Sequence, residues 1–233
     1  MNRDQILKEM GLGPIWKLRQ PPKKKKDAAS AVAAPVDART DTRTAAIAAM
    51  GWAELQRAVA DCQACALCKT RKQAVLGVGD PDADWLFIGE GPGADEDERG
   101  EPFVGKAGQL LDNMLAAIDL KRGERVYIAN AVKCRPPDNR TPEPGETAAC
   151  WPFLARQIEL IQPKLIVTLG KPAAQTLLQQ EVKIADARGQ VHDFAGMPLI
   201  VTYHPAYLLR SLLDKAKAWE DLCFMRKTMK ELR

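Results

Sequence analysis

Short apolar runs alternate with stretches of helical periodicity from Trp52 to the end of the chain. The apolar runs are bounded by turn-forming residues, which is typical of buried strands. We expect strands and helices in turn at Trp85–Gly89, Gly108–Leu120, Val126–Val132, Gly145–Ile161, Leu165–Leu169, Pro172–Gln180, Pro198–Tyr203 and Lys215–Leu232. This alternation predicts an α/β fold, with helices on both faces of a mostly parallel four-stranded sheet and a hairpin or loop at 187–196.

Three of the four predicted strands run into unusual polar sequence at their carboxyl ends. These segments read Gly-Glu-Gly-Pro-Gly at 89–93, Asn-Ala-Val-Lys-Cys at 130–134 and Thr-Tyr-His-Pro at 202–205. Ligands of open α/β sheets bind at the carboxyl ends of the strands. We therefore expect one site built from these three segments.

The remaining sequence sets the domain organisation. With 233 residues, 46% of them hydrophobic, the chain can bury one substantial core. Residues 1–50 contain a basic Pro-Pro-Lys-Lys-Lys-Lys run at 21–26 and then Ala-rich sequence, and we expect a disordered extension there before a single domain at 51–233. The net charge of +4 is compatible with a polyanionic partner but decides nothing. Without a membrane span or signal peptide, we expect a cytoplasmic protein.

Six cysteines suggest a metal site, because disulfides are rare in a reducing cytosol. Four thiolates from two parts of the chain could enclose a tetrahedral zinc ion or a 4Fe–4S cluster: Cys62, Cys65, Cys134 and Cys150. Their spacing does not choose between these metals, although zinc is the first expectation from the spacing alone. Cys68 is a rival ligand, and Cys223 is expected in the core of the last helix.

The segment after the first predicted strand argues against a phosphate-binding loop. Residues 94–105 combine an acidic cluster with an aromatic ring between a proline and a glycine. Together with the His-Pro-Ala-Tyr-Leu-Leu-Arg motif at 204–210 and the cysteine spacing, this segment resembles the family-4 uracil-DNA glycosylases from about residue 59 onward. The resemblance implies a three-layer αβα sandwich. It also implies a 4Fe–4S cluster, instead of zinc, on the four cysteines named above, with Cys68 as an extra thiol.

The same resemblance implies a DNA repair enzyme that flips uracil out of DNA and hydrolyses its N-glycosidic bond, leaving an abasic site. Phe103 matches the aromatic platform on which the flipped base stacks. Asn130 could donate to uracil O4 and accept from N3–H, a pattern that cytosine does not present. His204 is placed to donate to O2 of the departing uracil, where negative charge develops.

The residue that activates water is less clear from the sequence. The best-known branch of the superfamily has an aspartate where this chain has Gly91, which is expected to border the substrate. Glu90 is the favoured catalytic carboxylate and Glu96 the second choice. The same branch has an aromatic residue at the position of Gly93, so the first motif does not show how thymine is excluded.

Further residues are expected to contact DNA, which can be single- or double-stranded. Leu208 matches the apolar wedge that fills the space left by the flipped base. Arg210, Lys133 and Arg135 are expected at the rim, where they would contact phosphates.

Several alternatives remain at this point. A superfamily relative binds uracil-DNA covalently through a histidine, but the segment 135–140 contains none. The chain could also be a non-catalytic, metal-stabilised nucleic-acid-binding module, or a glycosylase for another deaminated base. We expect a monomer.

Overall fold

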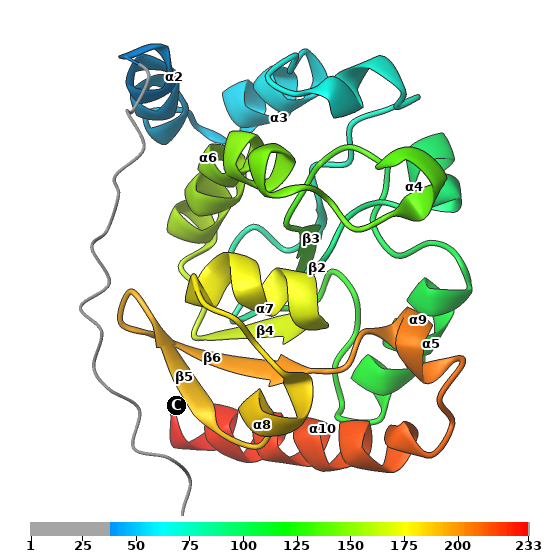
Figure 1. The fold of residues 1–233 in the computed structure, drawn as a ribbon. Coiled ribbons are helices and arrows are strands. Elements are labelled where there is room, and N and C mark those ends of the chain that lie inside the picture. The colour runs from blue at the N-terminus through cyan, green and yellow to red at the C-terminus, as the bar shows by residue number, and fades with distance from the viewer. Residues whose placement is uncertain (1–37, 233) are drawn as a thin grey trace, which may run out of the picture. The chain divides into compact units, whose positions relative to one another are not determined.

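The computed structural model describes residues 38–232, which fold as alternating helices and strands (Figure 1). In chain order the elements are α2 (Ala38–Ala48), α3 (Trp52–Ala60), η1 (Ala66–Lys69), β1 (Val78–Gly79), β2 (Trp85–Gly89), α4 (Ala94–Arg99), α5 (Lys106–Ala116), β3 (Val126–Asn130), η2 (Pro137–Asn139), α6 (Pro144–Ile161), β4 (Leu165–Leu169), α7 (Lys171–Leu178), α8 (Ile184–Ala187), β5 (Val191–Phe194), β6 (Met197–Thr202), α9 (Pro205–Leu208) and α10 (Asp214–Glu231).

The sheet has six strands in the order β1-β3-β2-β4-β6-β5, so the expectation of four strands was wrong. The four predicted strands are the inner ones and run parallel to each other. The two additional strands pair antiparallel at the edges. β1 has only two residues, which is too short for a periodic signal. β5 forms with β6 the hairpin expected near 187–196.

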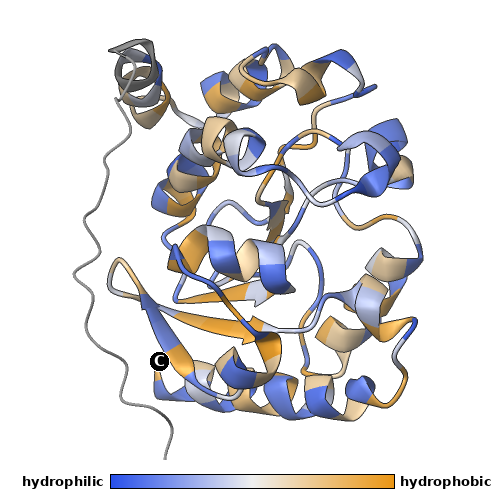
Figure 2. Ribbon diagram, in the orientation of Figure 1, coloured by the Kyte–Doolittle hydropathy of each residue, from blue (hydrophilic) through white to orange (hydrophobic). Residues whose placement is uncertain are grey.

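Helices cover both faces of the sheet, which confirms the α/β class and the layered arrangement (Figure 1). On one face, apolar side chains of α5 and α10 pack against alternate residues of the strands, such as Phe87 and Val167. On the other face, α6 and α7 pack against the intervening residues, such as Ile88 and Ile166. Buried on both sides, the inner strands are mostly apolar (Figure 2), with Asn130, Thr168 and Thr202 as buried polar residues.

The expectation of disorder up to residue 50 does not hold for residues 38–48, which form α2. Its Ile47 is 3% exposed and packs with Leu55, Val59 and Phe153 of α3 and α6. The sequence analysis missed this helix because it is rich in alanine and polar residues and has few apolar side chains. The basic run at 21–26 lies outside the described residues. Within the described chain, none of the helices combines the length and apolar character that a membrane crossing requires.

Candidate functional site

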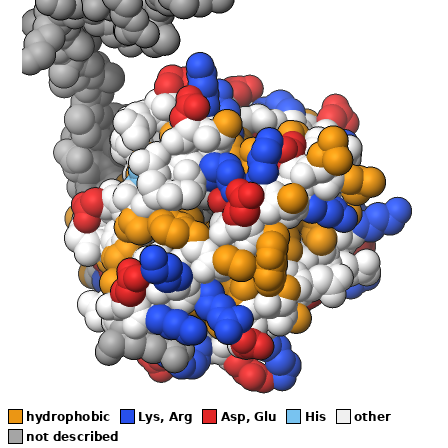
Figure 3. Space-filling model, turned by 90° about the horizontal axis from the view of Figure 1, so that it is seen from below, with side chains coloured by type: hydrophobic (Ala, Val, Ile, Leu, Met, Phe, Trp, Pro, Cys, Tyr) orange, Lys and Arg blue, Asp and Glu red, His pale blue; other side chains and the backbone are white. Residues whose placement is uncertain are grey.

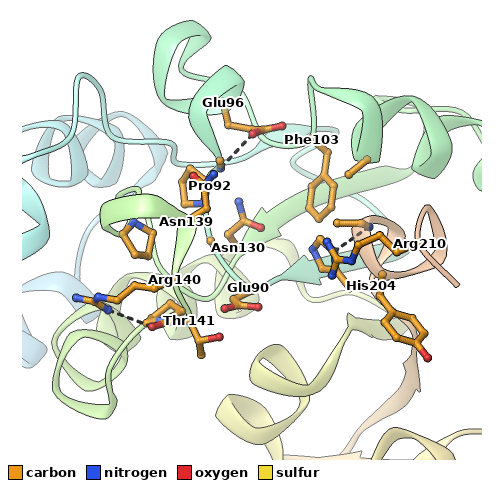
Figure 4. A pocket seen from close by; sticks show the side chains of 17 residues that line it. Glu90, Pro92, Glu96, Phe103, Asn130, Asn139, Arg140, Thr141, His204 and Arg210 are labelled. Carbon is orange, nitrogen blue, oxygen red and sulfur yellow. Dashed lines mark hydrogen bonds between the residues drawn. The ribbon is translucent and has the colours of Figure 1, made fainter.

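A cleft of about 520 Å³ opens at the carboxyl ends of β2, β3 and β6, where the sequence predicted one site. Glu90, Phe103, Asn130 and His204 extend into it from four different segments (Figure 4). Gly91, Glu96 and Arg210 also line it, so seven of the eight predicted catalytic and substrate-binding residues meet here. The size and polarity of this cleft suit a small polar ring such as a nucleobase.

Phe103 forms one wall of the cleft and is 6% exposed. Its backbone adopts a positive φ of 55°, which is uncommon for a non-glycine residue. Two interactions hold this conformation. Arg122 donates hydrogen bonds of 2.8 Å to the carbonyls of both Pro102 and Phe103, and Gly108 packs so closely that any side chain there would overlap the Phe103 carbonyl. The ring is therefore held in place before any ligand binds.

Asn130 ends β3 at the floor of the cleft and is 2% exposed. Its side-chain Oδ1 is buried and accepts no hydrogen bond from any described residue. A buried amide oxygen without a partner is costly, so the Asn130 amide has unused hydrogen-bonding capacity at the floor of the cleft. Gly89 lies beside it: a Cβ at that position would come within 2.5 Å of both Asn130 Oδ1 and the Phe103 ring. The glycine of the first motif thus makes room for the amide and the ring.

His204 follows β6 and begins α9. Its Nδ1 accepts a hydrogen bond of 3.1 Å from the backbone N–H of Ala206, so Nδ1 carries no proton. Burial, reinforced by the positive charge of Arg210, lowers the pKa of His204 to about 4. The imidazole is therefore neutral near pH 7 with its proton on Nε2, and it can act as a hydrogen-bond donor.

The two candidate carboxylates have different environments. Burial raises the pKa of Glu90, whose carboxylate faces the cleft and is hydrogen-bonded by the side chain of Thr141. Glu96 instead accepts hydrogen bonds of 2.9–3.1 Å from the backbone N–H groups of Gly93, Val104 and Gly105. It caps α4 and fixes the residues that follow Phe103. Its carboxylate is occupied, whereas that of Glu90 is available.

Two predicted DNA contacts are wrong. Leu208 is 1% exposed and packs in the core between the sheet and α10, because α9 turns this side chain inward. Lys133, expected at the rim, is also 1% exposed and lies beneath the cleft. Arg210 is exposed at the rim as predicted. Arg135 is half-buried and donates to Asn139 Oδ1 at 2.8 Å.

The cysteines that the sequence singled out lie around a second, smaller pocket beside α3 and α6. Its lining includes five thiols: Cys62, Cys65, Cys68, Cys134 and Cys150. Three cations surround them. Arg71 donates to Cys134 Sγ at 2.9 Å, Arg43 of α2 lies 3.7 Å from Cys62 Sγ, and Lys133 lines the same pocket. The remaining cysteine, Cys223, is exposed on α10, contrary to the expectation that it is a core residue.

The cysteine pocket and the cleft share one loop. The segment between Cys134 and Cys150 forms a whole wall of the cleft, contributing Pro136, Asn139, Arg140, Thr141 and Pro142. Arg140 braces this wall through two hydrogen bonds of 2.7 and 2.8 Å to the Glu146 carboxylate. From the sequence, this loop was expected near DNA only through residues such as Arg135, because nothing in its pattern shows that the loop folds over the cleft.

Known proteins resemble this chain in sequence. A family model for the uracil DNA glycosylase superfamily matches residues 76–223. A type-4 uracil-DNA glycosylase of Thermotoga maritima is 48% identical over 155 residues, which cover 66% of this chain and 80% of that protein. One from Pyrobaculum aerophilum is 41% identical over 181 residues, or 74% of this chain and 92% of the relative. The chain belongs to the type-4 uracil-DNA glycosylases.

The cysteine pocket of this type-4 family member fits an iron–sulfur cluster. Thiolates are the protein ligands of such clusters, and the three surrounding cations would offset their negative charge. Within the described residues, no three His, Cys, Asp or Glu side chains converge closely enough to hold a single metal ion.

Proposed function

We propose that this protein is a DNA repair glycosylase that flips uracil out of DNA and hydrolyses its N-glycosidic bond, leaving an abasic site. One observation carries the proposal: an aromatic wall, an amide with an unpaired oxygen and a neutral imidazole donor belong to residues that line one cleft, namely Phe103, Asn130 and His204. These groups offer stacking, edge recognition and leaving-group stabilisation, which base excision requires together.

Asn130 would select uracil by its edge. Its unpaired Oδ1 would accept the N3–H proton, and its Nδ2 would donate to O4. Cytosine presents an unprotonated N3 and an amino group at these two positions, so both hydrogen bonds would be lost. The base would stack on the Phe103 ring, whose backbone is already held by Arg122.

His204 would stabilise the leaving group. As the glycosidic bond breaks, the electron pair moves onto uracil and charge gathers at O2. A neutral imidazole with its proton on Nε2 would donate to that oxygen. Because Nδ1 is held by Ala206, the ring orientation is set before the substrate enters.

Glu90 would position the attacking water. Its carboxylate faces the cleft and is less committed than that of Glu96, which already accepts three backbone hydrogen bonds. An ionised Glu90 could accept a proton from water and also stabilise positive charge on the sugar. Glu96 would act indirectly, by fixing the Phe103 loop.

The DNA-binding surface would include Arg210 and the segment that follows it. Leu212 is 65% exposed and Leu213 is 92% exposed, so these residues, instead of the buried Leu208, are the candidates for the apolar wedge. Viewed from the side of α10, hydrophobic side chains are exposed among both basic and acidic ones (Figure 3). Arg210, which is close in sequence to these leucines and exposed, would contact phosphates.

A 4Fe–4S cluster would be held by Cys62, Cys65, Cys134 and Cys150, which share one pocket. When bound, the cluster would cross-link the segment before β1 to the loop that forms a wall of the cleft. We assign it no part in the hydrolysis. Cys68 lines the same pocket as a fifth thiol. We further propose that the enzyme works as a cytoplasmic monomer, because none of the described cysteines forms a disulfide and one chain holds all of the proposed groups.

The test is excision of a single uracil from a labelled oligonucleotide, scored as strand scission after alkali. The wild-type protein should cleave single- or double-stranded substrate, and His204→Ala should lower the rate by about 10²–10³. His192→Ala is the matched control, because the second histidine bonds to Ala187 outside the cleft and its loss should leave the rate unchanged.

Failure of cluster-loaded wild type to cleave either substrate would refute the proposal and favour a non-catalytic nucleic-acid-binding module. Cleavage of hypoxanthine but not uracil would indicate another deaminated base.

A further inference from the structure

Lys133 is a buried lysine that the chemistry described above does not use. It is 1% exposed and lies between β3 and the cysteine pocket. A buried ammonium without partners is strongly destabilising, so its neighbours must compensate for lost hydration. Lys133 forms no ion pair with a carboxylate of the described residues. The side chains of Cys134 and Cys150 line the same pocket as Lys133.

The Lys133 ammonium contacts the backbone of Asn130, the residue proposed to recognise the base. Lys133 Nζ donates a hydrogen bond of 2.8 Å to the backbone carbonyl of Asn130, a fully buried interaction. The N–H of the same peptide, from Ala131, donates to the Gly89 carbonyl at 2.9 Å. The peptide that follows Asn130 is thus held from both sides, and one of the two holders is Lys133.

The backbone of Lys133 is tied to the cysteine pocket as well. Its N–H donates to Cys150 Sγ at 3.2 Å, and its carbonyl accepts from Val75 N–H at 2.7 Å. Cys134 follows directly in the chain. A single residue therefore connects two cysteines of the pocket to the peptide of Asn130.

We propose that Lys133 is a positioning residue for base recognition. It links the binding of a cluster in the cysteine pocket to the position of Asn130. This inference rests on the proposed function. A cluster bound to Cys134 and Cys150 would fix the backbone of Lys133, whose N–H bonds to Cys150 Sγ, and Lys133 Nζ would in turn fix the Asn130 carbonyl. Loading of the pocket and affinity for uracil are then linked in both directions. The cluster serves recognition through Lys133 and takes no part in bond cleavage.

The test compares full-length, cluster-loaded wild type with Lys133→Met, which keeps the aliphatic length and removes the charge. Iron per chain, the melting temperature, kcat and KM on a uracil oligonucleotide, and inhibition by free uracil are measured for each. At equal iron content, Lys133→Met should bind free uracil about tenfold more weakly, with a corresponding loss in kcat/KM. Lys230→Met is the control, because Lys230 is exposed on α10 and lines neither the cleft nor the cysteine pocket. Its replacement should change none of these values.

Binding of free uracil separates this inference from the proposed function. Active wild type together with a Lys133→Met variant that holds its iron and binds uracil normally would refute the role of Lys133 alone. A wild type without excision activity would refute the proposed function itself. If Lys133→Met holds no iron, Lys133→Gln, which retains a shorter neutral donor, is compared by the same readouts. Normal uracil binding by that iron-loaded variant would equally overturn the inference.

Discussion

The rings of Phe103 and His204 lie 5.5 Å apart, with their planes inclined by 32°. The contact places the imidazole against an apolar surface, which disfavours its charged form. The hydrogen bond from Ala206 to Nδ1 acts in the same direction, because a protonated Nδ1 could not accept it. The geometry that stacks a base on Phe103 therefore also keeps His204 neutral.

The depressed pKa of His204 predicts a pH dependence of stability. Its pKa is about 4 in the folded protein, against the ordinary histidine value of 6.5 that applies to the unfolded chain. Between these values the unfolded chain binds more protons than the folded one, so this residue lowers stability as pH falls from 6.5 to 4. From pH 7 to pH 5 the loss is about 2 kcal/mol.

Melting temperatures at pH 7 and pH 5 check this prediction. His204→Gln should show a smaller acid shift than wild type, because glutamine does not titrate. The raised pKa of Glu90 acts with the opposite sign and is common to both proteins. An equal shift in the two proteins would show that His204 is not the group responsible.

Addition of one methyl group at Gly89 should strongly reduce the rate of uracil excision. In Gly89→Ala the new Cβ would lie 2.5 Å from Asn130 Oδ1 and from the Phe103 ring, so both must move. We expect kcat/KM for uracil excision to fall by about 10²-fold, because displacement of binding groups by even about 1 Å has costs of that order. The control is Gly145→Ala, where a Cβ meets no atom within 4 Å. Comparable activity in both variants would contradict the proposed arrangement of ring and amide.

Replacement of an exposed leucine should affect excision from double-stranded and single-stranded DNA differently. Leu213→Ala should slow excision from double-stranded DNA about tenfold, and less from single strands, because a wedge is needed where a stack must be filled. Its melting temperature should not change, since Leu213 is 92% exposed. Leu208→Ala should instead cost about 2–5 kcal/mol of stability, as for other buried leucines. Excision assays on both substrates, with melting curves, distinguish the two; an unchanged duplex rate for Leu213→Ala would exclude it as the wedge.

The site was predictable from sequence where local pattern and topology agree. Apolar runs locate the inner strands, and parallel strands bring their carboxyl ends to one edge, so sequence alone could place Glu90, Asn130 and His204 together. The edge strands could not be found this way. β1 is two residues long, and its pairing depends on a distant partner, β3.

The errors about single side chains have one physical cause: sequence patterns do not show which way a side chain points after the chain turns. Leu208 and the exposed Leu209 are neighbours of the same type, and only the turn of α9 decides which of them is buried. Lys133 was assigned to the rim because lysines are rarely buried, yet its Nζ has a buried acceptor in the Asn130 carbonyl. The contribution of Arg43 to the cysteine pocket was invisible for a similar reason, since it depends on how α2 packs.

Because Glu90 and Glu96 have different roles, replacement by glutamine should have a different effect at each position. Glu90→Gln should lower kcat about 10²–10³-fold with little change in KM or melting temperature, because a carboxamide cannot accept a proton from water. The wild-type rate should fall as pH drops through the raised pKa of Glu90, and this acid limb should be missing from the variant. Glu96→Gln should raise KM and lower the melting temperature, because its new N–H₂ group would oppose the backbone donors that now bind it. If Glu96→Gln instead abolished kcat at constant KM and stability, Glu96 would be the catalytic carboxylate, and the three backbone hydrogen bonds would serve to orient it.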